Sequence, residues 1–173
     1  MLKGWIVTNL IIFFVGNCFE YDLLNQMLDG LKSKTVSTTA LSFKEEGFTN
    51  FNEFSMAFES DFLFGNEKFN LDSLFDEHQK LNFEKKLKEQ GPLSFETKKV
   101  VNKQALISPG EDHNILYQFS YPLIQRGKKD ILYGFVLVRT IGPFGESGDE
   151  TLKLFRLFEG KWVEIHKATV SII

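Results

Sequence analysis

Apolar residues in the first part of the chain recur at helical spacing. Positions 19, 23, 24, 27, 28 and 31 are apolar, and Gly30 and Ser33 follow as stop signals, so we predict a helix over about 19–31. Phenylalanines at 48, 51, 54 and 58, with Phe62 after them, predict a second helix over about 50–61. A stripe at this spacing is typical of a core-facing side, and we therefore expect these rings in the core.

The stretches around the second helix carry less regular patterns. Residues 32–42 are polar and rich in hydroxyl groups, which predicts a loop or a short exposed strand. Apolar residues at 71, 74 and 75 share a helical face that His78 adjoins, with Asn70 or Asp72 as the cap. Residues 82–90 predict a further short helix ended by Gly91 and Pro92, or the second half of one helix that is kinked near Asn82.

From Phe95 onward the pattern changes to that of strands. Turn residues separate five strand-like runs, at about 96–107, 115–123, 130–140, 151–158 and 162–169. The run 130–140 is apolar on both faces, which predicts a central strand covered on each side. The connections are short and favour antiparallel neighbours. The sequence therefore predicts an α+β fold with N-terminal helices packed on a C-terminal antiparallel sheet of about five strands.

The first residues have the pattern of an export signal. Lys3 supplies a positive charge, an apolar run from Ile6 to Val15 follows, and the first acidic residue is Glu20. The run is too short for a comfortable membrane span, which takes about 20 residues. The only cysteine of the chain, Cys18, follows directly after this run.

The segment Val15-Gly16-Asn17-Cys18 resembles the lipobox of bacterial lipoproteins. Gly16 fits the small residue expected there, whereas Asn17 departs from the pattern. The resemblance implies a signal peptide at 1–17, a single α+β domain at 18–173, and membrane attachment through an acylated Cys18. Two alternatives stay open: a cleaved signal without lipidation, or a first strand or helix of the fold with Cys18 in the core.

Charge and histidine placement limit the chemistry that the chain can be expected to perform. The net charge is -3, and no basic stripe marks a nucleic-acid site; the densest basic cluster, at 85, 86 and 88, alternates with acids like a solvated helix face. His78 and His113 each follow two acids, on a helix and in a turn, and Glu164 and His166 are expected to share one strand face as a solvated pair. We predict no catalytic site, no metal site and no cofactor.

A glycine-rich loop and its surroundings carry the one family resemblance of the C-terminal part. Gly142 to Gly148 lacks the phosphate-loop form and predicts a hairpin loop between two strands. This loop, together with Ser120-Tyr121-Pro122-Leu123, Tyr133-Gly134-Phe135-Val136 and Gly160-Lys161-Trp162, resembles a group of uncharacterised exported, lipoprotein-type proteins of Bacteroidetes-type bacteria. The resemblance implies export to the cell envelope, and no activity. The order of helices before a curved sheet is also similar in topology to the cone-shaped nuclear transport factor 2-like fold.

Two functional hypotheses follow. The first is a non-enzymatic, lipid-anchored envelope domain that binds a protein or a small ligand through its sheet face or the 142–148 loop. The alternative is an enzyme or a metal-dependent binder, which requires His113, His166 or several acids to meet in one cleft.

Overall fold

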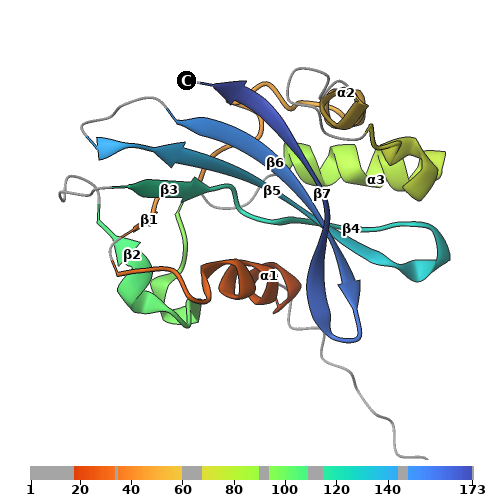
Figure 1. Ribbon diagram of the computed structural model, residues 1–173. Coiled ribbons are helices and arrows are strands. Elements are labelled where there is room, and N and C mark those ends of the chain that lie inside the picture. Colours follow the sequence, from red (N-terminus) through yellow and green to blue (C-terminus); the bar gives the residue numbers. More distant parts are fainter. Residues whose placement is uncertain are drawn as a thin grey trace, which may run out of the picture.

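A computed structural model describes residues 18–33, 35–59, 68–89, 94–108, 115–143 and 148–172. It confirms the α+β class: the helices come first in the chain and the long strands last (Figure 1). Its helices are α1 (Cys18–Leu28), α2 (Phe51–Glu59) and α3 (Glu77–Lys88). Its strands are β1 (Val36–Ser37), β2 (Leu106–Ile107), β3 (Leu116–Phe119), β4 (Leu123–Arg126), β5 (Leu132–Ile141), β6 (Asp149–Phe158) and β7 (Lys161–Ile172).

The strands form one mixed sheet in the order β2-β1-β3-β5-β6-β7, with β4 also paired to β5. Four strand pairs, β3–β5, β4–β5, β5–β6 and β6–β7, are antiparallel, as the short connections predicted. The expectation of about five strands, all antiparallel, was wrong in detail, because β1 pairs in parallel with both β2 and β3. The predicted exposed stretch 32–42 in fact supplies β1, whose two residues are buried.

Two other predicted elements also differ from the structure. The run 96–107 contains two short 3-10 helices, Thr97–Lys99 and Lys103–Ala105, before the two-residue β2. The segment 71–90 is not a kinked helix: a 3-10 turn capped by Asn70 comes first, and α3 then starts afresh after Asp76. Asp76 and Gln79 exchange side-chain and backbone hydrogen bonds of 2.8 and 2.9 Å, a capping box that fixes this start.

The central strand β5 is covered on both faces, as its pattern predicted. On one face Tyr133, Phe135 and Leu137 pack against a cluster from α2 and α3; on the other, Val136 and Val138 pack against α1 and the segment around Phe95. Figure 1 shows α1 on one side of the sheet and α2 and α3 on the other. The sheet is therefore the middle of three layers.

Phenylalanine rings build the α2 and α3 side of the core. The rings of Phe54, Phe83 and Phe135 meet pairwise edge to face, with centroids 4.8 to 5.6 Å apart. This is the geometry that aromatic quadrupoles favour. Phe48, Phe51 and Phe58 are buried in the same cluster, which confirms the predicted stripe; Phe62 lies outside the described residues.

On the other side, α1 lies directly on the sheet because β5 has a glycine beneath it. A Cβ atom on Gly134 would lie 2.5 Å from Leu23 Cδ2 of the helix and 3.3 Å from the ring of Trp162. The missing side chain lets the helix approach closely, so that Leu23 and Leu24 are fully buried.

β3 and β4 lie end to end along the same edge of β5, and a buried serine bridges the break between them. The Ser120 backbone N–H donates to the Leu137 carbonyl at 2.8 Å. Its hydroxyl Oγ accepts from the Leu137 N–H at 2.9 Å. The side chain thus takes the place of a backbone acceptor where the strand bends before Pro122.

Replacing Ser120 with alanine is expected to destabilise the protein by about 1–3 kcal/mol, because the Leu137 N–H would be buried without an acceptor. Urea unfolding measures the change, and Ser108→Ala, at the exposed position directly after β2, serves as the matched control. Equal free energies of unfolding for the two variants would contradict this role.

Candidate functional site

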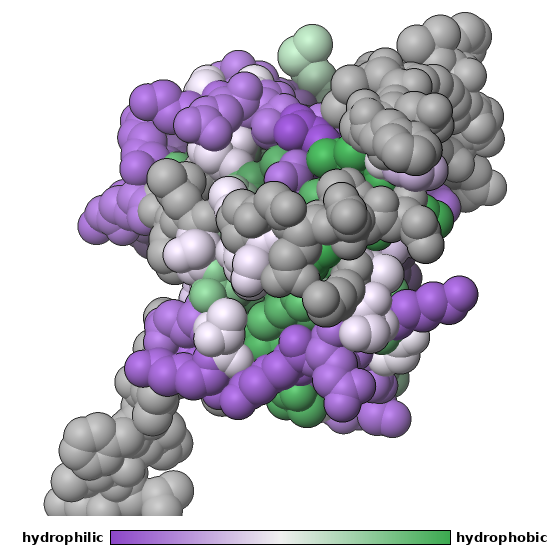
Figure 2. Space-filling model, turned by 90° about the vertical axis from the view of Figure 1, so that its left-hand side faces the viewer, coloured by the Kyte–Doolittle hydropathy of each residue, from purple (hydrophilic) through white to green (hydrophobic). Residues whose placement is uncertain are grey.

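The α1 side of the sheet contains a cavity of about 460 Å³ beside the helix. Its floor comes from β3, β5, β6 and β7, and one wall comes from the end of α1. Seen from the end of the molecule where β3 begins, hydrophobic side chains are visible between hydrophilic rims (Figure 2). This volume lies in the range of small-molecule sites, about 300–1,000 Å³.

The cavity exists because the elements on this face have unequal lengths. α1 has 11 residues and spans about 16 Å. β6 has 10 residues and β7 has 12, so that they extend for about 33–40 Å. The segment 95–106 and α1 pack over Phe119, Ile124 and Val136, and within the described ranges no element packs on this face of the outer parts of β6 and β7, which line the cavity.

Side-chain amides fix the position of α1 beside the cavity. Gln26 exchanges hydrogen bonds with the backbone of Trp162 on the edge strand β7: its side-chain NH₂ donates to the carbonyl, and its Oε1 accepts from the N–H at 2.9 Å. Asn25 makes the same kind of exchange on the other side, with Lys99 O at 3.1 Å and Val101 N at 2.8 Å. The helix is therefore held between β7 and the segment 97–102.

The cavity wall is apolar on the side of β3. Tyr117 and Phe119 of β3 and Val138 of β5 line the floor there, and Met27 and Leu31 of the α1 region face them. These side chains present a surface for an apolar or aromatic body.

Toward β7 the lining becomes polar and charged. Thr151 and Lys153 of β6 lie directly opposite Thr169 and Lys167 of β7 in the sheet. Glu164 pairs with Lys153 at 2.8 Å, and Asp149 lies at the outer end of β6. The cavity therefore has an apolar half and a half that carries hydroxyl, ammonium and carboxylate groups.

A β-bulge separates the two residues that were expected to form a solvated pair. The register of β6 and β7 shifts between Leu154 and Phe155, so that Leu154 faces His166 whereas Phe155 faces Glu164. Glu164 consequently lines the cavity, while His166 lies on the other face, stacked on Phe69 with ring centroids 4.9 Å apart. The expectation that Glu164 and His166 share one face was wrong.

The other histidines and acids do not gather at the cavity. His78 was expected near an apolar face, but it is exposed on α3, with its Nδ1 3.3 Å from Asn82 Nδ2. His113 lies outside the described residues. Within the described ranges, no group of three histidine, cysteine or acidic side chains could hold a metal ion.

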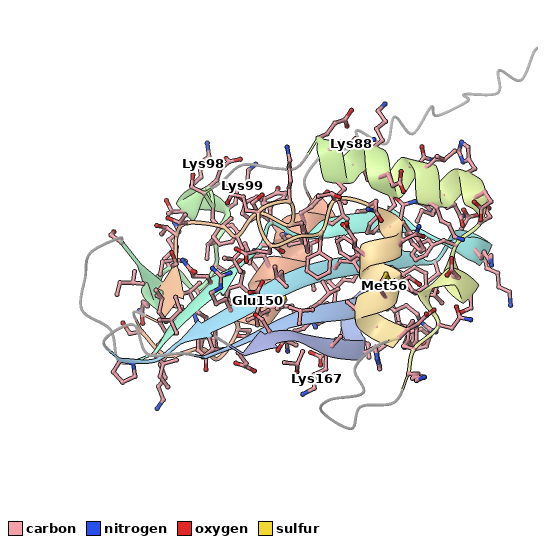
Figure 3. The ribbon with its side chains drawn as sticks, turned by 90° about the horizontal axis from the view of Figure 1, so that it is seen from above. Met56, Lys88, Lys98, Lys99, Glu150 and Lys167 are labelled. Carbon is pink, nitrogen blue, oxygen red and sulfur yellow. The ribbon has the colours of Figure 1, made fainter. Side chains whose placement is uncertain are left out.

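A partly buried ionic cluster lies on the α2 and α3 side of the sheet. The Arg139 guanidinium of β5 pairs with Glu46 and, at 3.1 Å, with Glu150 of β6, whose side chain is only 5% exposed. The Ser171 hydroxyl donates to the same Glu150 oxygen at 3.3 Å. Figure 3 shows Glu150 inside the outline of the sheet. Because Glu46 belongs to the turn at 42–47, we assign to this cluster a structural role, the attachment of that turn to β5 and β6.

Several other sequence predictions concern the ends and connections of the chain. Cys18 is the first residue of α1, and the proposed signal at 1–17 lies outside the described residues. The 142–148 loop joins the antiparallel strands β5 and β6, as predicted for a hairpin loop, although its residues 144–147 are outside the description. No helix among the described residues has the length and apolar character that a membrane crossing requires.

Sequence reasoning missed Lys153 and Lys167 as site residues. Their alternation with apolar neighbours marks one sheet face, but which face is open depends on the length of α1 and on the bulge. Neither property has a clear sequence signal. No protein-family model matches this chain, and neither a curated protein nor a solved structure is significantly similar to it.

Proposed function

We propose that the protein is a non-enzymatic binding domain for a small amphipathic ligand, carried on the bacterial envelope by an acylated Cys18. The observation that carries the binding part is the cavity of about 460 Å³ with one apolar and one polar half. Few convergent polar groups over an apolar floor are typical of ligand sites.

The alternative, a histidine-based enzyme or metal-dependent binder, has less support from the described residues. His78 is exposed on α3, and His166 stacks on Phe69 on the opposite face of the sheet from the cavity. Neither is among the residues that line the cavity. Among the described residues that line the cavity, the ionisable side chains a reaction could use are Tyr117 and the lysines and carboxylates of β6 and β7.

Filling the cavity is expected to abolish binding. Thr151 lies on the cavity floor, and a Thr151→Trp side chain would occupy the space that a ligand needs. With the neutral dye Nile red as the probe, fluorescence titration should show affinity at least about tenfold lower in this variant than in the native chain.

Thr97→Trp is the matched control, because Thr97 is exposed on a 3-10 turn and is not part of the cavity lining. It should bind the dye like the native chain. Equal dye binding by all three proteins, or no binding by any, would overturn the ligand-binding proposal. Thermal unfolding of each variant establishes that it is folded.

The envelope part of the proposal is supported by the sequence around Cys18. Expression of the full chain in a bacterial host should yield a membrane-associated product cleaved before Cys18 with added acyl mass. In a Cys18→Ala variant both the acyl mass and the membrane association should be lost, since a lipid anchor needs the sulfur and stable attachment needs more than one acyl chain. Intact-mass measurement on membrane and soluble fractions decides this; an uncleaved, soluble native chain would contradict it.

A further inference from the structure

We propose that the ligand of this cavity is an amphipathic monocarboxylate, whose carboxylate binds between Lys153 and Lys167 while its apolar body lies against β3, β5 and the end of α1. This inference rests on the proposed ligand-binding function and specifies the chemical class of the ligand. It is argued from the register of β6 and β7 and from the charges that line the cavity.

The two lysines form a pair that is unfavourable without a counter-charge. Lys153 and Lys167 are directly opposite one another on antiparallel strands, where neighbouring Cβ atoms are about 5 Å apart. Like charges in this arrangement destabilise a sheet. Pairs of residues that break a local rule of stability in this way are expected mainly at functional sites.

One anion already compensates part of this charge. Glu164 accepts from the Lys153 ammonium at 2.8 Å. The Lys167 side chain is exposed, and its ammonium group has no ion pair or hydrogen bond with another described residue. Lys153, Lys167 and Glu164 therefore sum to one positive charge at this point of the sheet, which a single carboxylate would neutralise, whereas the whole lining, with Asp149 at the outer end of β6, sums to zero.

The groups next to the lysines favour one orientation of the ligand. Thr151 and Thr169, the next facing pair that lines the cavity, offer two hydroxyl donors beside the ammonium groups. Asp149 lies four residues from Lys153 along β6, about 13 Å away, and would repel a carboxylate at that outer end.

The apolar half of the cavity then receives the rest of the molecule. Tyr117, Phe119 and Val138 form the floor toward β3, and Met27 and Leu31 form the wall. A cationic amphiphile with its apolar body in this half would bring its charge next to Lys153 and Lys167, and the carboxylate that could attract it instead, Asp149, lies about 13 Å from Lys153 along β6. The arrangement therefore distinguishes ligands by the sign of their charge.

Calorimetric titration of the full chain with three probes of similar apolar length tests this assignment. The probes are decanoate, methyl decanoate and decyltrimethylammonium, each used below its aggregation concentration. Decanoate should bind at least about tenfold more tightly than either of the others, the factor expected from one charge-assisted hydrogen bond in a partly enclosed site.

Variants of two residues test the assignment of the carboxylate. Lys167→Met keeps the apolar stem and should reduce decanoate affinity about tenfold, with methyl decanoate unchanged. Glu164→Gln should increase decanoate affinity, because Lys153 would no longer be paired with a carboxylate. A purely structural effect of the glutamate would instead weaken the binding of every probe.

Lys88→Met is the matched control for the loss of one lysine charge. Lys88 is exposed on α3, and Figure 3 shows it at the opposite edge of the molecule from Lys167, which projects from β7. Its decanoate affinity should equal that of the native chain. If Lys88→Met and Lys167→Met weaken binding equally, the net charge of the protein governs the effect and the assigned site is wrong.

The remaining outcomes separate this inference from the function on which it rests. Equal affinity for all three probes, with Nile red binding still abolished by Thr151→Trp, would overturn the carboxylate site and leave the cavity as an apolar binding site. Tighter binding of decyltrimethylammonium would also overturn it and would indicate a cationic ligand. Absence of binding by every probe and by Nile red would overturn the proposed function itself.

Discussion

The structure depends on the burial of β5 on both of its faces. Phe135 and Leu137 point to one side and Val136 and Val138 to the other, so the strand needs an apolar layer above and below it. The α2 and α3 side meets this demand with a set of interlocked phenylalanine rings. On the other side, the described residues that cover the sheet over β3, β4 and β5 are those of the 11-residue α1 and of the segment 95–106.

This inequality of the two layers accounts for the cavity. Where α1 ends, β6 and β7 continue, and their side chains on that face can be polar because no helix in the described part of the chain covers them. The amide contacts of Asn25 and Gln26 hold α1 on both sides, so that the cavity wall is set by specific hydrogen bonds as well as by packing. The proposed binding function and the proposed carboxylate site both follow from a sheet face that is covered over only part of its area.

The sequence predicted those parts of the fold that depend on local periodicity. The two-sided apolar pattern of 130–140 identified the central strand, and the phenylalanine spacing at 48–58 identified the core side of α2. It failed where tertiary pairing and packing decide. The run 96–107 has strand-like residues but forms two 3-10 turns before the two-residue β2, and Val36 pairs with β2 and β3 and is buried in the cluster under α1. The bulge at Leu154 and Phe155 placed Glu164 and His166 on opposite faces, since one additional residue reverses the alternation. The candidate site could not be predicted either, because the same bulge decides which side chains of β7 face the cavity.

The most direct measurement of the central claim is the location of a bound ligand on the sheet. Amide chemical shifts of the isotopically labelled chain, recorded as decanoate is added, report which backbone positions the ligand affects. The account predicts that the largest changes occur at Lys153, Lys167 and their neighbours on β6 and β7, with smaller changes at Met27 on α1. Changes concentrated on α2 and α3, such as at Phe54 or Phe83, would contradict it, because the closed aromatic layer and not the open face would then be the binding site.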